Sequence, residues 1–300
     1  MADAVRPSYR TTLEDLGDAW SRCQACELGV SRVQVGGSFV FGEGASGGIM
    51  FVGEGPGKDE EAQGRPFIGK SGRFFRRLLE DLQFNKYYIT NTVCCRSWDF
   101  SYDTQGTRII IENRRTKQKE YKIDDVAPKP SQRIACKPRL IQQIYSVDPV
   151  LIVALGGAAA ETLLGRSVKI QAEAALWAKN GIMDHIRLPG AGFIPQLTAK
   201  GAWVRRTGPK GNRQLIAPYI QNLVIYPIVP LLHPAFAAAN HRDQRQDSPM
   251  HIFTTGLQLV RNVYAAYMGE VYGDQHVTYE ISDKGINEAL EDDYVGSDYD

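Results

Sequence analysis

Three polar residues of this chain stand at or just beyond the ends of short apolar runs, where a parallel α/β sheet presents its functional groups. They are Glu54 after the run 49–52, Asn91 within the run 87–93, and His233 after the run 225–232. A carboxylate can position water, a side-chain amide both donates and accepts hydrogen bonds, and an imidazole can donate to developing negative charge. A lone histidine is more often structural, so the chemical interpretation depends on the three strand ends converging.

A glycine-rich loop, Gly53-Glu54-Gly55-Pro56-Gly57, interrupts the first of these runs. Glycines permit positive φ and leave amide N–H groups uncovered, so the loop can contact a ligand through its main chain. It lacks the Lys-Ser/Thr of a P-loop and the GxGxxG spacing of a dinucleotide fold. Taken alone, the loop indicates a strand-end site in an α/β domain, with a simple tight turn as the alternative.

The chain contains five cysteines, an odd number, and its N-terminus lacks the apolar core of a secretory signal. They are Cys23, Cys26, Cys94, Cys95 and Cys136. This pattern argues against a disulfide framework and favours ligation of a metal or cluster. The CxxC pair at its start is shared by zinc sites, redox pairs and iron–sulfur proteins, and on chemistry alone four thiolates suit zinc and iron–sulfur equally.

Composition separates a basic body from an acidic tail. The 300 residues are 43% hydrophobic, enough for a substantial core, and carry a net charge of +1. Residues 270–300 hold ten acidic residues and one lysine, so residues 1–269 carry a net charge of +10. A basic body suits a phosphate-bearing partner, with a solvated basic surface as the alternative. No apolar run approaches the ~20 residues of a membrane span, and we expect a cytoplasmic protein with no membrane partner.

Hydrophobic periodicity predicts an α/β fold, a three-layer α/β/α sandwich with a central, mainly parallel four-stranded sheet. The strands are the runs 49–52, 87–93, 149–155 and 225–232. The expected helices are 11–22, 72–82, a segment from Pro138 through Ile144, 156–164 and 250–268, and the glycine-interrupted segment 33–43 is expected to be a hairpin or irregular strand.

Two segments look like insertions into a single domain that spans residues 1–269. The first, about 97–133, contains the alternating basic stretch 108–123, which predicts a β-hairpin arm against DNA or a partner, or a solvent-facing decoration. The second, about 190–222, is a basic loop. Residues 270–300 form an acidic, partly disordered tail, which could solubilise the protein, shield the basic face or dock to a basic partner protein.

Several motifs occur together in an order that resembles the family 4 uracil-DNA glycosylases. They are the 53–57 loop, the acidic run 59–61, Gly64-Arg65-Pro66-Phe67 with Gly69-Lys70-Ser71-Gly72, the segment 89–96, and His233-Pro234-Ala235. The resemblance covers most of residues 20–268 outside the two insertions. It implies a uracil-DNA glycosylase-like fold and an enzyme that flips uracil out of single- or double-stranded DNA, hydrolyses its N-glycosidic bond and leaves an abasic site.

The resemblance also assigns roles to individual residues. Phe67 would stack on the base, Asn91 would hydrogen-bond its pyrimidine edge, and His233 would hydrogen-bond O2 of the leaving base. Glu54 would position water or stabilise the sugar, together with the amides of Gly55 and Gly57. The remaining assignments are Gly53 and Gly55 at the base, and Phe236, Arg242 and Arg245 at the DNA.

For the cysteines, the resemblance implies a [4Fe–4S] cluster held by Cys23, Cys26, Cys95 and Cys136, with Cys94 as a spare thiol. Two alternatives to uracil excision remain at the sequence level. One is a glycosylase for another modified pyrimidine, because insertions flank the site. The other is a non-catalytic DNA-binding or replication module on the same fold.

Overall fold

The computed structural model describes residues 12–112, 117–181, 183–189, 223–243, 245–268, 271–272, 275–276 and 290. The expected second insertion and most of the acidic tail lie outside these residues. Within them, no helix combines the length and the apolar character that a bilayer crossing requires.

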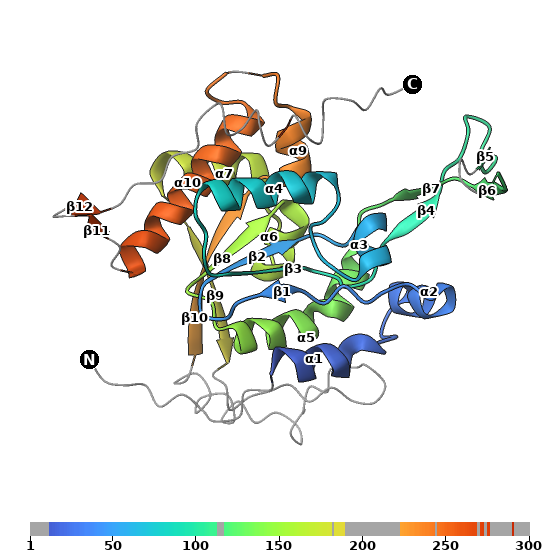
Figure 1. Ribbon diagram of the computed structural model, residues 1–300, viewed down its shortest axis with the longest axis horizontal. Helices are drawn as coiled ribbons and strands as arrows, with labels where there is room; N and C mark the ends of the chain where they lie inside the picture. The colour runs from blue at the N-terminus through green and yellow to red at the C-terminus, as the bar shows by residue number, and fades with distance from the viewer. Residues whose placement is uncertain are drawn as a thin grey trace.

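A six-stranded sheet forms the centre of the molecule, in the order β1-β3-β2-β8-β10-β9 (Figure 1). Its strands are β1 (Glu43–Gly44), β2 (Ile49–Gly53), β3 (Tyr87–Asn91), β8 (Leu151–Leu155), β9 (Asp184–Pro189) and β10 (Leu223–Leu231). The four inner strands run parallel to one another, while β1 and β9 pair antiparallel with them at the two edges. The predicted four-stranded parallel sheet is therefore confirmed, and two antiparallel edge strands extend it.

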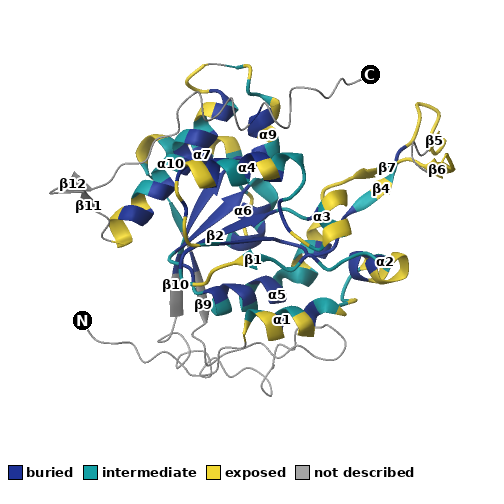
Figure 2. Ribbon diagram, in the orientation of Figure 1, coloured by how far each residue is buried: buried dark blue, intermediate teal, exposed yellow. Residues whose placement is uncertain are grey.

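Helices cover both faces of this sheet, which gives the predicted three layers (Figures 1 and 2). One face packs against α4 (Lys70–Asp81), α7 (Ile170–Asn180), α9 (Pro234–Ala239) and α10 (Pro249–Met268). The other packs against α5 (Pro130–Val147) and α6 (Gly157–Leu164), with α1 (Leu13–Ser21) outside α5. Because both faces are covered, β2 is buried along its whole length, with Phe51 in one core and Met50 and Val52 in the other.

Two expected elements differ from the structure. The segment 33–43 is not a hairpin, because α2 (Glu27–Val35) runs into it and ends at Gly36, whose φ of 69° supplies a left-handed C-cap. Cys136 does not precede a helix but lies inside α5, which begins at Pro130. Proline is favoured at the first helical position, and Gln132 caps this start by accepting from the Lys129 backbone N–H at 2.8 Å.

The first insertion forms an arm that extends away from the body beside α3 (Lys58–Gln63) (Figure 1). Its strands are β4 (Trp98–Phe100), β5 (Ile110–Glu112), β6 (Lys119–Tyr121) and β7 (Ile123–Asp125). They pair antiparallel as β4 with β7 and β5 with β6, so the predicted hairpin is confirmed. A second small ladder, β11 (Val271–Tyr272) with β12 (Gln275–His276), follows α10 in the sequence.

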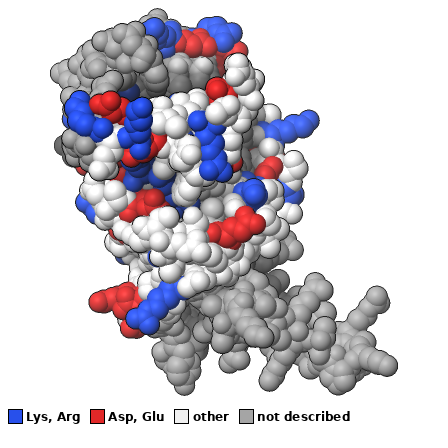
Figure 3. All heavy atoms as spheres, turned by 90° about the vertical axis from the view of Figure 1, so that its right-hand side faces the viewer, with Lys and Arg blue, Asp and Glu red and all other residues white. Residues whose placement is uncertain are grey.

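The arm is fastened at its base and exposed along its outer strands (Figure 2). At the base, Arg96 pairs with Asp125 at 2.5 Å and with Glu61 of α3 at 3.7 Å. Further out, the Arg108 guanidinium lies 3.9 Å from the centre of the Phe100 ring. Viewed from the side on which the arm extends, acidic and basic side chains are interspersed (Figure 3). This view of the described residues therefore shows no large patch of one sign.

Candidate active site

The predicted catalytic residues lie at one edge of the sheet, at the carboxyl ends of β3, β2 and β10. Gly53, the last residue of β2, is the register partner of Asn91 at the end of β3. On the other side of β2, the end of β8 leads into Gly156, whose Cα faces the His233 side chain. Adjacent strands lie about 4.8 Å apart, so β2 and β10 are separated by roughly 10 Å across β8. The predicted convergence of Glu54, Asn91 and His233 at one sheet edge is confirmed.

Gly53, Asn91 and Phe67 approach one another most closely. A Cβ atom on Gly53 would collide with Oδ1 of Asn91 and would lie 2.5 Å from Cζ of the Phe67 ring. Asn91 is 2% exposed, and its Nδ2 is buried without a hydrogen-bond partner. A buried amide donor without a partner costs about 1–3 kcal/mol, which a ligand that accepts from it would recover. Because Gly53 has no side chain, the Phe67 ring and the Asn91 amide can both lie against it. The Asn91 Nδ2 group remains available to donate a hydrogen bond to a ligand.

Glu54 presents a second unpaired polar atom at the same edge. Its main-chain carbonyl accepts hydrogen bonds from the Thr92 hydroxyl at 2.5 Å and the Val93 N–H at 3.4 Å, which ties the loop to the end of β3. Its carboxylate oxygen Oε1 is buried and has no partner. Burial raises the pKa of Glu54, and the charge of Arg133 opposes this shift. Two of the three predicted catalytic residues, Glu54 and Asn91, thus hold unsatisfied polar atoms.

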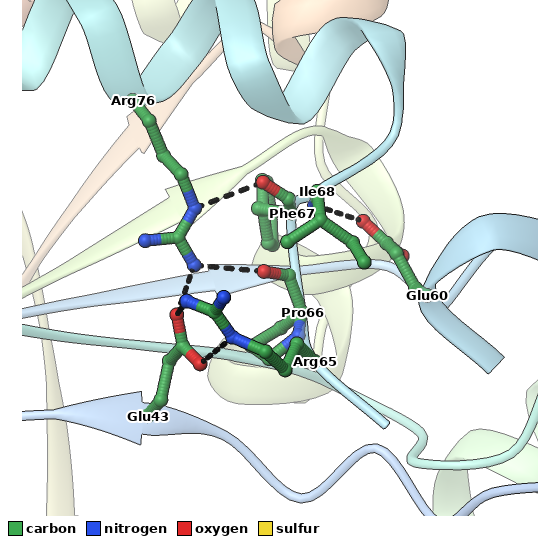
Figure 4. Close-up of polar contacts among 7 residues, drawn as sticks. All are labelled: Glu43, Glu60, Arg65, Pro66, Phe67, Ile68 and Arg76. Atoms are coloured by element: carbon green, nitrogen blue, oxygen red, sulfur yellow. Dashed lines mark hydrogen bonds and ion pairs between the residues drawn. The ribbon is translucent and has the colours of Figure 1, made fainter. Parts of the chain in front are cut away.

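Phe67 has the left-handed backbone conformation, with a φ of 54°, that non-glycine residues rarely adopt. Arg76 of α4 stabilises this turn by donating to the Phe67 carbonyl at 2.9 Å and the Pro66 carbonyl at 2.8 Å (Figure 4). Glu43 accepts from Arg76 at 2.5 Å and from Arg65 in a bidentate pair at 2.9 Å. The geometry of the turn is thus imposed by charged side chains from β1 and α4.

Glu60 supports the other side of the same turn, and sequence reasoning assigned it no role. Its carboxylate accepts from the Gly57 N–H at 2.8 Å and the Ile68 N–H at 3.2 Å, and the amides of Phe67 and Gly69 also donate to it. Burial raises the pKa of Glu60, while these four donors oppose the shift. The sequence does contain a pattern that could have predicted this role: Glu60 lies three residues after the N-cap Gly57, a spacing that is typical of a capping box.

The bond from Gly57 to Glu60 corrects one expectation. The amides of Gly55 and Gly57 were both expected to assist Glu54 at the ligand. The Gly57 N–H is directed to the Glu60 carboxylate, so the Gly57 amide stabilises the loop instead. Gly55 lies against Val93, where an added Cβ would be 3.0 Å from the Val93 Cγ2.

His233 caps the start of α9 with its ring. The Ala235 N–H donates to Nδ1 at 3.2 Å, so the neutral ring carries its proton on Nε2. Burial lowers the pKa of His233 to about 4. Near pH 7 the imidazole is therefore a neutral hydrogen-bond donor. Gly156, with a φ of 93°, sits against this ring, and an added Cβ there would lie 3.2 Å from that of His233.

The three residues predicted to contact DNA follow His233 along the chain. Phe236 is 40% exposed on α9, one turn after His233, and its N–H donates to the His233 carbonyl at 3.0 Å. Arg245 is exposed but forms a bidentate pair with Asp243, at 2.9 and 2.7 Å. Arg242 is exposed beyond the C-terminal end of α9. All three side chains are therefore exposed, and Phe236 is the one whose backbone is hydrogen-bonded to His233.

The five cysteines line one small cavity, of about 20 Å³, with apolar walls that include Trp20, Leu28 and Phe39. Burial raises the pKa of the Cys95 thiol to about 12, so a free thiol there stays protonated. Cys94 is fully buried, and its Sγ donates to the Phe41 carbonyl at 3.7 Å. In the part of the chain that the structure describes, no three His, Cys, Asp or Glu side chains are grouped closely enough to hold a metal ion.

Comparison with known proteins identifies relatives. A family model described as the uracil DNA glycosylase superfamily matches residues 41–254. The Type-4 uracil-DNA glycosylase of Thermotoga maritima is 33% identical over 162 residues, which is 53% of this chain and 69% of that protein. Those of Saccharolobus solfataricus and Pyrobaculum aerophilum are 32% and 33% identical over 48% and 51% of this chain, which corresponds to 55% and 64% of their own lengths.

The packing of Gly72 against the Phe67 turn generates a first prediction. In Gly72→Ala, the new methyl group would lie 2.5 Å from both Cα and O of Phe67, main-chain atoms that cannot move cheaply. We expect the free energy of unfolding to fall by about 3 kcal/mol. Gly69→Ala is the matched control, since no atom lies within 4 Å of its added Cβ, and we expect a loss below about 1 kcal/mol. Equal losses in urea denaturation would contradict this account.

The burial of neutral His233 generates a second prediction. Its pKa is about 4 in the folded protein and about 6.5 when unfolded, so the unfolded chain binds the proton first as the pH falls. Between pH 6.5 and pH 4 this difference should remove about 3 kcal/mol of folding free energy. His233→Gln should make the pH dependence of unfolding shallower by that amount. His251→Gln, at an exposed position on α10, should leave the dependence unchanged. A slope unaltered by His233→Gln would refute the assignment.

Proposed function

We propose that this protein excises uracil from DNA. The uracil DNA glycosylase superfamily model matches residues 41–254, more than half of the chain, so the chain belongs to that superfamily. The reaction hydrolyses the N-glycosidic bond and leaves an abasic site. The observation that carries this proposal is the close approach of Gly53, Phe67 and Asn91 at a strand end, with the Asn91 amide unpaired. The names of the relatives support the same activity.

Recognition of the base requires it to leave the DNA stack, because a glycosylase cannot reach its bond inside a duplex. Asn91 can then donate from Nδ2 to O4 of uracil and accept N3–H at Oδ1, a pairing that the amino group of cytosine would not satisfy. The Phe67 ring offers a stacking surface that its turn holds in place. Gly53 keeps the floor of the pocket free of a side chain, as the predicted base-binding role of this residue requires.

His233 stabilises the departing base in this proposal. Negative charge builds on uracil as the glycosidic bond breaks, and an Nε2–H donor aimed at O2 would offset it. A preorganised donor of this kind contributes about 10²–10³-fold in rate. Because the Ala235 N–H occupies Nδ1, the tautomer is set before the substrate binds and no proton transfer is needed.

Glu54 acts on the sugar side. Its buried, unpaired Oε1 can accept a hydrogen bond from the attacking water or face the oxocarbenium-like sugar. The raised pKa of this carboxyl predicts that activity depends on its ionisation at a pH above the usual range of a glutamate. Phe236 would fill the gap that the extruded nucleotide leaves, and Arg242 and Arg245 would contact phosphates, to which the basic body is attracted.

We also propose that Cys23, Cys26, Cys95 and Cys136 hold a [4Fe–4S] cluster. Their thiols line one apolar cavity, and four cysteines are the usual donor set of such a cluster. The cavity is about the size of one water molecule, so the thiols must spread apart when the group binds. The cluster would link α1, α2, β3 and α5 covalently. The reaction described above uses none of its chemistry.

We propose that the acidic tail docks to a basic protein or shields the basic face, as its ten acidic residues suggest. We also propose a cytoplasmic location.

The arm formed by β4–β7 begins beside the Glu54 loop, because Pro128 lies 3.8 Å from a Cβ placed on Gly55. We propose that DNA bound at the site passes near the base of this arm.

A third prediction concerns the base pocket. We expect His233→Ala and Asn91→Ala each to slow uracil excision at least ~10²-fold in single-turnover assays, because both act on the extruded base. Binding to uracil-containing DNA should persist in both. His251→Ala, outside the site, should retain full activity. Wild-type rates in both pocket variants would exclude this pocket, and wild-type protein without activity would favour the non-catalytic DNA-binding alternative.

A fourth prediction concerns the cysteines. Purified wild-type protein should be brown and contain about four irons per chain. Cys94→Ser should retain this iron, because a serine hydroxyl can still donate to the Phe41 carbonyl. Cys95→Ser should lose the colour and the iron. Stoichiometric zinc in place of iron would refute the cluster, and the reverse pattern in the two variants would exchange the roles of Cys94 and Cys95.

A further inference from the structure

A fully buried arginine lies between the cysteine cavity and the base pocket. The guanidinium of Arg139, on α5, donates from Nη2 to the carbonyls of Asn91 at 2.8 Å and Thr92 at 2.6 Å, and from Nη1 to the Gln143 side chain. Nη2 also lies 3.6 Å from the Sγ of Cys136. No carboxylate forms an ion pair with Arg139 among the residues with described side chains.

A second arginine, Arg32 on α2, has the same character. It is 7% exposed and donates to the carbonyls of Ser21 at 2.7 Å and Gly37 at 3.4 Å, and its positive charge opposes the larger effect of burial, which raises the pKa of the Cys95 thiol. Its Nε is buried without a partner. Burial raises the pKa of Glu61 and the charge of Arg32 opposes this shift in part, but the Glu61 carboxylate forms its ion pair with Arg96, at 3.7 Å. Within the described part of the chain, Arg32 too has no carboxylate partner within ion-pairing distance.

Buried cations without counter-charges are rare, since the desolvation of one ion costs several kcal/mol unless an anion compensates. Both arginines are hydrogen-bonded to carbonyls, which satisfies donors but supplies no negative charge. The ionisable groups that both contact are the thiols. Four thiolates around a [4Fe–4S] core in its usual oxidised form, or around one Zn²⁺, carry a net charge of about −2, which two guanidinium groups would balance.

We propose that Arg32 and Arg139 are the counter-cations of the metal-bound thiolates in this protein. Arg139 hydrogen-bonds Cys136, and Arg32 lies on α2, whose residues Leu28 and Gly29 line the cysteine cavity together with Cys95. They act as positioning residues outside the ligand set, where substitutions commonly lower metal affinity 10–100-fold. This inference rests on the proposed metal site but holds for iron–sulfur and zinc alike, because both leave the same excess of negative charge.

Arg139 has an additional consequence for the base pocket. One nitrogen, Nη2, reaches the Cys136 thiol and the carbonyl of Asn91, the residue whose side chain is proposed to read uracil. Loss of the thiolates would leave this cation uncompensated and favour its movement, and the end of β3 would move with it. Arg32 has no contact with β3 carbonyls, so the two arginines should differ in their effect on excision.

The test compares Arg139→Met and Arg32→Met with Arg261→Met in metal-loaded, full-length protein. Arg261 is a matched control, since it is also a buried arginine, 1% exposed, but it contacts the Leu82 carbonyl and the Phe84 ring far from the cysteines. The readout is the rate at which a chelator removes metal. We expect release at least ~10-fold faster than wild type in Arg139→Met and Arg32→Met, and unchanged release in Arg261→Met.

Three further measurements keep the proposal falsifiable. Arg139→Lys retains the charge and should release metal more slowly than Arg139→Met, even if the methionine variant folds poorly. If the metal is a cluster, its reduction potential should become more negative in both methionine variants, because a nearby positive charge is lost. Uracil excision should fall in Arg139→Met and stay near wild type in metal-replete Arg32→Met.

The outcomes separate this inference from the iron–sulfur assignment. Wild-type protein that contains zinc would refute the cluster, while the order of release rates among the variants would still test the arginines. Release rates in Arg139→Met and Arg32→Met equal to those of Arg261→Met, with equal potentials, would overturn the counter-cation role.

Discussion

Four parallel strands that end in register at one edge are the constraint on which the rest of this structure depends. Gly53 faces Asn91 across β2 and β3, and β8 brings Gly156 against His233. Parallel strands are buried on both faces, so only their carboxyl ends can present polar groups to a ligand. Glu54 and Asn91 keep buried polar atoms without partners there, and in the proposed function the substrate satisfies them.

The turn at Phe67 shows how contacts with neighbouring residues fix the position of a side chain at these strand ends. A left-handed backbone at a phenylalanine costs on the order of 1–3 kcal/mol and persists only where surrounding contacts determine it. The Glu60 carboxylate accepts hydrogen bonds from backbone N–H groups on both sides of the turn. Arg76 is held by Glu43 and donates hydrogen bonds to two carbonyls of the turn. The charged residues of this region therefore position the Phe67 ring, which itself lies beside the Asn91 amide and Gly53.

The cysteine cavity follows a different electrostatic rule. Around the Phe67 turn, the arginines pair with a carboxylate, whereas beside the thiols they face sulfur and backbone carbonyls. This difference points to negative charge on the thiols when the site is loaded. It also connects two parts of the protein that appear separate in the fold, since β3 carries Asn91 at its end and Cys95 four residues later.

The sequence alone determined the strand ends, the four parallel strands and the residues Glu54, Asn91 and His233, because hydrophobic runs and the motifs that follow them are local patterns. It also predicted the hairpin arm. It did not reveal that Gly57 serves Glu60, that Cys136 lies within α5, or that Arg139 joins Cys136 to Asn91, residues 45 positions apart. Those facts depend on which faces of the helices pack together. Burial decides the partners and the pKa of a charged side chain, and burial exists only in the folded chain.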